Sequence, residues 1–208
     1  MGKDSSGSRQ EMRIRIAHLA ARMIAEDGIS DYGLAKRKAA RQAGAPDSRN
    51  LPTNVEIEDA LRAYQTLYQA DEHPERLQYL RHLALEMMRL LEPFNPHLTG
   101  PVLSGSVGKH AEIHLHLYTD NLKELELFLL NREIPFRTRQ MRMWSGDAAV
   151  TVPSFLVRTE DADFVITALS PQHRRQPLRV SSEGRPLERA PIQSVESLLA
   201  GGLGEPAP

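Results

Sequence analysis

Apolar side chains recur three and four positions apart through the first ninety residues, which is the spacing of one face of an α-helix. This pattern predicts four helices, at about residues 11–27, 31–43, 54–68 and 74–91. Gly28 and Gly44 stand where helix C-caps belong, Thr53 or Asn54 can cap the third helix, and Pro74 can open the fourth. The first ten residues are polar, and we expect them to be disordered.

The pattern changes after Pro93. Ile113, Leu115 and Leu117 alternate with polar residues, which predicts a half-buried strand over residues 112–118. Further strands are expected near 101–103, 134–143, 149–158 and 163–169, with helices over 122–130 and 194–200. The sequence therefore predicts an α+β fold, in which an all-helical N-terminal region (residues 11–92) precedes a mixed sheet with flanking helices (93–200). A polar tail, 201–208, is expected to be disordered.

Composition narrows the classes of function. The chain has 208 residues and no cysteine, which excludes disulfides, thiolate metal sites and cysteine nucleophiles. It has neither a signal-peptide pattern nor a window of ~18 apolar residues, so we expect a cytoplasmic protein without a membrane partner. The formal net charge is −1, yet residues 1–50 hold ten basic and six acidic residues, whereas residues 51–100 hold four and eight.

The candidate chemistry lies between the predicted strands. Gly105 and Ser106 follow one strand; a glycine lets the backbone approach a phosphate closely, and a serine adds a hydroxyl donor. Glu112 and His114 are two positions apart on the next strand, so their side chains share one face. With Asp163 at the start of a later strand, they could hold magnesium against a triphosphate.

This block resembles the nucleotidyltransferase fold of the DNA polymerase β superfamily over about residues 93–171. Members have a Gly-Ser turn, then Asp-x-Asp on the next strand, then a third Asp two strands later. Residues 104–118, SGSVGKHAEIHLHLY, and residues 162–171, ADFVITALSP, look like these motifs. The resemblance implies that Gly105, Ser106 and Lys109 bind the phosphates of a nucleoside triphosphate such as ATP. It also implies a catalytic, Mg²⁺-binding set of Glu112, His114 and Asp163, and transfer of a nucleotidyl group to an acceptor.

Three departures from the family pattern weaken the implied catalysis. Glu112 replaces the first Asp, His114 replaces the second, and the five-residue spacer between Ser106 and Glu112 is short for the family. Magnesium prefers oxygen ligands, and imidazole is a poor substitute. We therefore expect a degenerate site whose transfer activity is weak or lost. In a simpler interpretation, Gly105-Ser106 is an ordinary turn, and Glu112 and Asp163 are solvated side chains.

Other classes of function stay open. A non-catalytic module that binds nucleotide, RNA or a protein partner fits the same residues. His114 and His116, with Glu112, also form a pattern that binds zinc or manganese in unrelated folds, although histidines on a wet strand face are usually ordinary surface residues.

Basic segments suggest a DNA-binding regulator as a further alternative. Two helices joined at Gly28 could form a helix-turn-helix, whose second helix contains Lys36, Arg37, Lys38 and Arg41. The pI near 6.7 argues against a dedicated nucleic-acid binder, and four cations on one helix usually form a solvated face. Arg137, Arg139 and Arg142, together with His173-Arg174-Arg175, could add a second basic surface, although such arginines more often pair with Asp and Glu on neighbouring strands.

Overall fold

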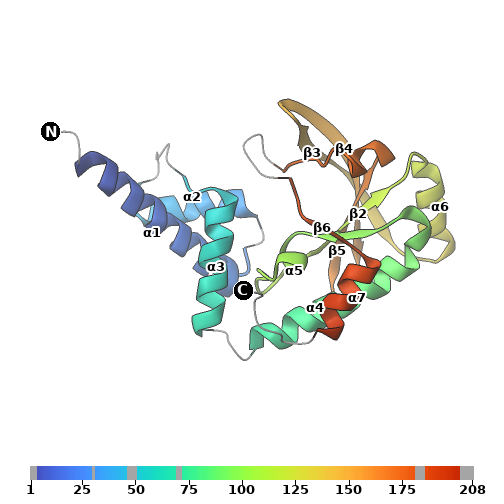
Figure 1. The fold of residues 1–208 in the computed structure, drawn as a ribbon, viewed down its shortest axis with the longest axis horizontal. Coiled ribbons are helices and arrows are strands. Elements are labelled where there is room, and N and C mark those ends of the chain that lie inside the picture. Colours follow the sequence, from blue (N-terminus) through green and yellow to red (C-terminus); the bar gives the residue numbers. More distant parts are fainter. Residues whose placement is uncertain (1–3, 30, 46–50, 69–71, 181–185, 202–208) are drawn as a thin grey trace. The chain divides into compact units, whose positions relative to one another are not determined.

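The protein is an α+β protein that divides into two compact units, seen here in a computed structural model. The structure describes residues 4–29, 31–45, 51–68, 72–180 and 186–201. The helical unit comprises Met1–His73 and Ser106–Ala111, and the sheet unit comprises Pro74–Gly105 and Glu112–Pro208. Figure 1 shows the elements of both units. The described residues include no helix with the length and apolar character needed to cross a membrane.

The helical unit is built around its first helix. Helix α1 (Asp4–Glu26) packs against both α2 (Tyr32–Gln42) and α3 (Asn54–Tyr68). The residues that α2 buries are small, which lets it approach its neighbours closely; they are Ala35, Ala39, Ala40 and, at the C-cap, Ala43. Helix α1 begins at Asp4, so the helix extends into the ten residues that were expected to be disordered.

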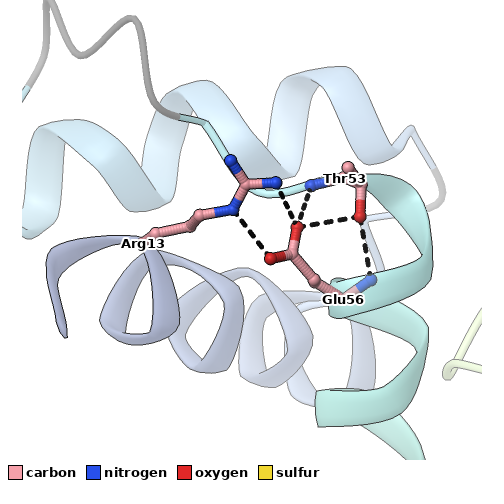
Figure 2. Close-up of polar contacts among 3 residues, drawn as sticks. All are labelled: Arg13, Thr53 and Glu56. Carbon is pink, nitrogen blue, oxygen red and sulfur yellow. Dashed lines mark hydrogen bonds and ion pairs between the residues drawn. The ribbon is translucent and has the colours of Figure 1, made fainter. Parts of the chain in front are cut away.

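The third helix starts at a capping box, the reciprocal pair of hydrogen bonds that the residues Thr-x-x-Glu form at a helix N-terminus. The Thr53 amide donates to Glu56 Oε2 at 2.6 Å, and the Glu56 amide donates to Thr53 Oγ1 at 3.2 Å. Arg13 on α1 then donates to both carboxylate oxygens of Glu56, at 2.7 and 2.8 Å (Figure 2). Of the two cap residues that the sequence allowed, Thr53 and Asn54, the structure uses Thr53, and Arg13 ties this cap to the neighbouring helix.

The sheet unit begins with a helix and contains one mixed sheet. In chain order it has α4 (Glu72–Leu90), η1 (Glu92–Phe94), β1 (His97–Thr99), α5 (Pro101–Ser104), β2 (Ile113–Tyr118), α6 (Leu122–Asn131), β3 (Phe136–Ser145), β4 (Ala148–Arg158), β5 (Asp163–Leu169), η2 (Pro171–Arg174), β6 (Arg189–Pro191) and α7 (Ile192–Ala200). The strand order is β3-β4-β5-β2-β1-β6, and β2 and β5 are the parallel neighbours.

One face of the sheet packs against helices. Helices α4, α6 and α7 lie along this face (Figure 1), and Arg89 of α4 pairs with Glu196 of α7 at 2.7 Å. Buried strand residues of this face include Leu98, Ile113, Leu115, Leu117, Phe155 and Ile166, and the helices contribute Leu80, Met88, Leu91, Leu125, Leu129 and Val195. The opposite face has polar residues in the middle of the sheet and, beside them, a second buried apolar cluster of Tyr118, Met143, Val152, Leu169 and Leu178.

Several local predictions differ from the structure. Residues 101–104 form a turn of helix rather than a strand, because Pro101 occupies its first turn and the strand before it ends at Thr99. Helix α4 belongs to the sheet unit, so the boundary follows His73 instead of Pro93. Strand β6 has only three residues and was not predicted. Of the predicted tail at 201–208, Gly201 is the C-cap of α7, and residues 202–208 lie outside the described residues.

Candidate functional site

The second face of the sheet is polar through its middle. Strand register aligns Arg139, Ser154, Thr167, His116 and His97 in one row across β3, β4, β5, β2 and β1. A neighbouring row contains Arg137, Leu156, Val165, His114, Thr99 and Arg189. Directly opposed residues of paired strands point to the same side of a sheet, so both rows share one face. We call these two rows the polar face.

The predicted metal residues lie at one end of the polar face. Strand β5 is the parallel neighbour of β2, and Asp163 lies two residues before Val165, the partner of His114. The side chains of Asp163 and His114 therefore point to the same side of the sheet. The Glu112 Oε2 and His114 Nε2 atoms are 3.8 Å apart, which is too long for a hydrogen bond. Asp163 Oδ2 lies 3.6 Å from the Arg158 guanidinium instead.

These three residues do not fit a magnesium ion. Across the part of the chain that the structure describes, no three His, Asp or Glu side chains gather closely enough to hold a metal. Asp163 faces a cation, and His114, at the second position of the motif, is an imidazole, a poor ligand for magnesium. No reaction step is therefore routed through a metal at Glu112, His114 and Asp163.

The predicted phosphate-binding turn is divided between the two units. Gly105 belongs to the sheet unit, where it ends α5 with a φ of +83°, a left-handed conformation that favours glycine. Ser106 and Lys109 belong to the helical unit. The side chain of Ser106 is buried and lies near Tyr32, whose pKa is raised mainly by burial. Gly105-Ser106 is thus a turn after a short helix.

Three histidines of the polar face have lowered pKa values, with burial as the largest cause. The pKa of His116 falls to about 3, with smaller contributions from His114, Arg189 and His97. Burial and then Arg139 lower the pKa of His114, but about a third of its side chain is exposed, so burial affects it less. Burial, with smaller effects of Arg174 and Arg189, lowers the pKa of His97. All three imidazoles are neutral at pH 7.

Buried polar atoms on this face have no hydrogen-bond partner among the described residues. They are Thr99 Oγ1, His116 Nδ1 and Ser154 Oγ, in residues that are at most 5 % exposed. Unpartnered buried polar atoms are rare in folded proteins and usually indicate a bound water, ion or ligand.

The prediction that β2 is half buried was wrong, because His116 and Tyr118 on its second face are buried as well.

Cations surround this set of neutral side chains. Arg189 donates to the Tyr118 hydroxyl at 2.6 Å and to the carbonyl oxygens of His173 and Arg174 at 3.2 and 3.3 Å, which fixes η2 beside β6. An open pocket of about 670 Å³ is lined by Pro171, Gln172, Arg174, Arg175 and Gln176. Because Arg189 of β6 donates to the carbonyl oxygen of Arg174, this pocket lies beside β6.

Arg189, Thr99 and Ser154 were not identified from the sequence as site residues. Alternation along β2 and along β5 shows which residues of each strand share a side. It does not show that the two strands are neighbours, so the sequence could not bring these residues together. Of the arginines considered for a second basic surface, Arg137 and Arg139 share the polar face, whereas Arg142 points to the other side of β3.

Comparisons with protein-family models, with curated proteins and with solved structures found no significant match to this chain.

Proposed function

We propose that the sheet unit is a nucleotide-binding module with a nucleotidyltransferase-like layout and with weak or no nucleotidyl transfer. The observation on which this rests is the polar face, where Arg139, Arg174 and Arg189 surround three neutral histidines and three unpartnered buried polar atoms. Guanidinium groups bind phosphate oxygens through charge-assisted hydrogen bonds, and neutral imidazoles and hydroxyls can serve either a donor or an acceptor of a ligand.

The electrostatics of the polar face favour an anion. Burial and the arginines lower the pKa of His97, His114 and His116, and the physical reason is that additional positive charge is unfavourable there. Burial, the largest cause, disfavours charge of either sign, whereas the smaller effects of Arg139, Arg174 and Arg189 oppose positive charge alone. These three arginines attract negative charge, so a phosphate group is a better occupant than a cation. The pocket beside Arg174 and Arg175 supplies an open side at which phosphates can enter.

The proposed loss of transfer follows from the side chains at positions 112, 114 and 163. Nucleotidyl transfer needs stabilisation of the charge that develops on the phosphate oxygens, which the superfamily obtains from carboxylate-bound magnesium. Here Asp163 faces Arg158, and His114 contributes no negative charge. Binding through arginines requires no such carboxylate set.

The test is a calorimetric titration of ATP, inorganic triphosphate and adenosine into the intact protein, each with Mg²⁺ and with EDTA. We expect ATP and triphosphate to bind in EDTA and adenosine to bind much more weakly. Arg139→Ala should weaken ATP binding about tenfold, since a hydrogen bond to a charged group contributes on the order of 1.5 kcal/mol. Arg142→Ala is the matched control, because it removes the same charge from the other face of β3.

A parallel assay with α-phosphate-labelled ATP measures transfer, and we expect no labelled product. Absence of ATP and triphosphate binding, or equal losses in Arg139→Ala and Arg142→Ala, would overturn the proposed site. Robust transfer by the wild-type chain would overturn the proposed loss of activity and indicate an active enzyme.

A further inference from the structure

We propose that the outer face of α2 binds the phosphate backbone of nucleic acid, a function separate from nucleotide binding by the sheet unit. The residues of α2 divide cleanly into two faces. Ala35, Ala39 and Ala40 are buried, whereas Leu34, Arg37, Lys38 and Arg41 are exposed. Positions 34, 37, 38 and 41 follow the spacing of one helical stripe. We call Arg37, Lys38 and Arg41 the basic stripe.

The basic stripe is not neutralised by the helical unit. Helix α2 contains four cations and no acidic residue. Among the described residues, no ion pair joins Arg37, Lys38 or Arg41 to a carboxylate, whereas the exposed Arg22 and Arg62 pair with Glu26 and Asp59 at 3.6 and 2.8 Å. Three like charges on adjacent turns repel one another, and a polyanion that binds there would relieve this repulsion.

Lys36 differs from these three residues. It is half buried, and its pKa is lowered mainly by burial and also by Arg13, while Glu56 acts in the opposite direction. Lys36 therefore belongs to the packed side of α2, and the surface available to a partner consists of the other three cations.

The composition of the stripe distinguishes nucleic acid from other polyanions. An amphipathic helix that binds membranes inserts large apolar or aromatic side chains between its cations, but Leu34 is the single large apolar residue on this face of α2. A protein partner would bury an apolar or aromatic centre, which the stripe also lacks. A sugar–phosphate backbone needs mainly cations with long, adaptable side chains.

The geometry indicates backbone contact without base reading. Arg37 and Arg41 are four residues apart, hence about 6 Å along the helix, and a duplex presents one charge per ~1.7 Å of its axis. Three cations can therefore contact two or three phosphates. Contacts of Arg37, Lys38 and Arg41 to phosphates carry no sequence information, so binding through such contacts should be indifferent to sequence.

The experiment is fluorescence anisotropy of labelled DNA duplexes of two different sequences, titrated with the intact protein between about 20 and 200 mM salt. For three phosphate contacts, log K should fall with log salt at a slope of about −2 to −3, and the two sequences should bind equally. At physiological salt we expect weak, non-specific binding with a Kd on the order of 10⁻⁴ M. In Arg37→Ala/Arg41→Ala the slope should decrease in magnitude by about two units.

The matched control is Arg22→Ala/Arg62→Ala, which removes two exposed arginines from α1 and α3 and changes the net charge equally. It should keep the wild-type slope. Equal effects of the two double variants, or no duplex binding at low salt, would overturn the proposal. Binding to anionic lipid vesicles in place of the duplex would also overturn it. We expect both variants to fold, since Arg37 and Arg41 are exposed and their loss leaves the buried alanines of α2 in place. Circular dichroism of each variant checks this.

Discussion

At the scale of single residues, neighbours across the sheet decide the chemistry of the histidines. Sequence parity places Glu112, His114 and His116 on one strand face, and the structure agrees. Their burial depends on β1, β5 and η2, which are distant in sequence, so the sequence predicted a wet face where His116 is buried. The pairing of Asp163 with Arg158 likewise requires the β4–β5 register.

The substitution His114→Asp tests whether the imidazole is what weakens metal binding at this end of the polar face. It adds a carboxylate beside Glu112 on the face shared with Asp163, and the affinity of oxygen sites for Mg²⁺ rises with ligand charge. We expect Mg²⁺-dependent ATP binding to increase at least about threefold by calorimetry. Glu112→Ala in the His114→Asp background should abolish the gain.

His114→Asn is the control for this substitution, since it has the size of His114→Asp without the charge. If neither variant differs from wild type, the superfamily's metal site does not map onto these residues. An equal gain in both would show that removal of the imidazole, rather than the added carboxylate, changes nucleotide binding.

The lowered pKa of Glu56 predicts that the stability of the helical unit depends on pH. Arg13 and the capping box lower the pKa of Glu56 to about 2, whereas an unfolded glutamate titrates near 4.3. A carboxylate with a lowered folded pKa stabilises the protein above its unfolded pKa, and this stabilisation is lost as the pH falls through about 4 toward 2. Glu56→Gln preserves the capping box but not the charge.

We therefore expect Glu56→Gln to be about 1 kcal/mol less stable than wild type above pH 5, a small value because the pair is partly exposed and screened. The difference should shrink toward zero near pH 2. Urea unfolding followed by circular dichroism measures both curves. A difference that is constant with pH would mean that the Arg13–Glu56 ion pair does not contribute to stability.

At the scale of elements, the sequence predicts what local patterning and capping determine. The helix over 122–130 is confirmed as α6, and Asn121 accepts a hydrogen bond from the Glu124 amide at 3.1 Å as its N-cap. Strands β2, β4 and β5 are confirmed within about one residue. Strand β6 could not be predicted, since three residues have no periodicity and β6 exists through pairing with β1.

Helix α4 shows a further limit of prediction from sequence. Its periodicity reveals that one side is apolar, but not which part of the protein that side packs against. If α4 is part of the core of the sheet unit, Met88→Ala should lower the stability of that unit by about 2–5 kcal/mol, the usual cost of truncating a buried Met. Trp144 is the only tryptophan of the chain and lies in β3, so its fluorescence reports unfolding of the sheet unit.

Glu86→Ala is the control on the exposed side of α4 and should change stability by less than about 0.5 kcal/mol. A Trp144 unfolding midpoint that is unchanged in Met88→Ala would place α4 outside the sheet unit's cooperative core.

At the scale of the whole molecule, the two units are assembled from alternating stretches of the chain. Residues 106–111 interrupt the sheet unit and belong to the helical unit. A boundary inferred from a change of pattern along the chain assumes that each domain is one continuous stretch. The sequence analysis therefore predicted a single boundary, at Pro93. The discontinuity arises from long-range packing, and it assigns Ser106 and Lys109 to a different unit from the other predicted site residues.

Limited trypsin digestion tests this assembly. Within the helical unit, Gln65 Nε2 donates to the Val107 carbonyl, and Val107 is 2 % exposed. A Cβ on Gly108 would lie 2.6 Å from the Ile24 carbonyl oxygen, so the backbone at Gly108 touches α1. Although Lys109 is exposed, proteases need a locally unfolded backbone. We therefore expect the first cuts in the chain termini or within residues 45–53, and none between 100 and 170.

Gln65→Met provides the comparison, because it removes the donor to Val107 while keeping a long side chain. Cleavage after Lys109 should become several times faster in this variant, as time-resolved intact-mass spectrometry would show. Such an increase would show that contacts with α1 and α3 limit the local opening of residues 106–111. Early cleavage after Lys109 in the wild-type chain would mean that residues 106–111 are not held by the helical unit, and the discontinuous assembly would be incorrect.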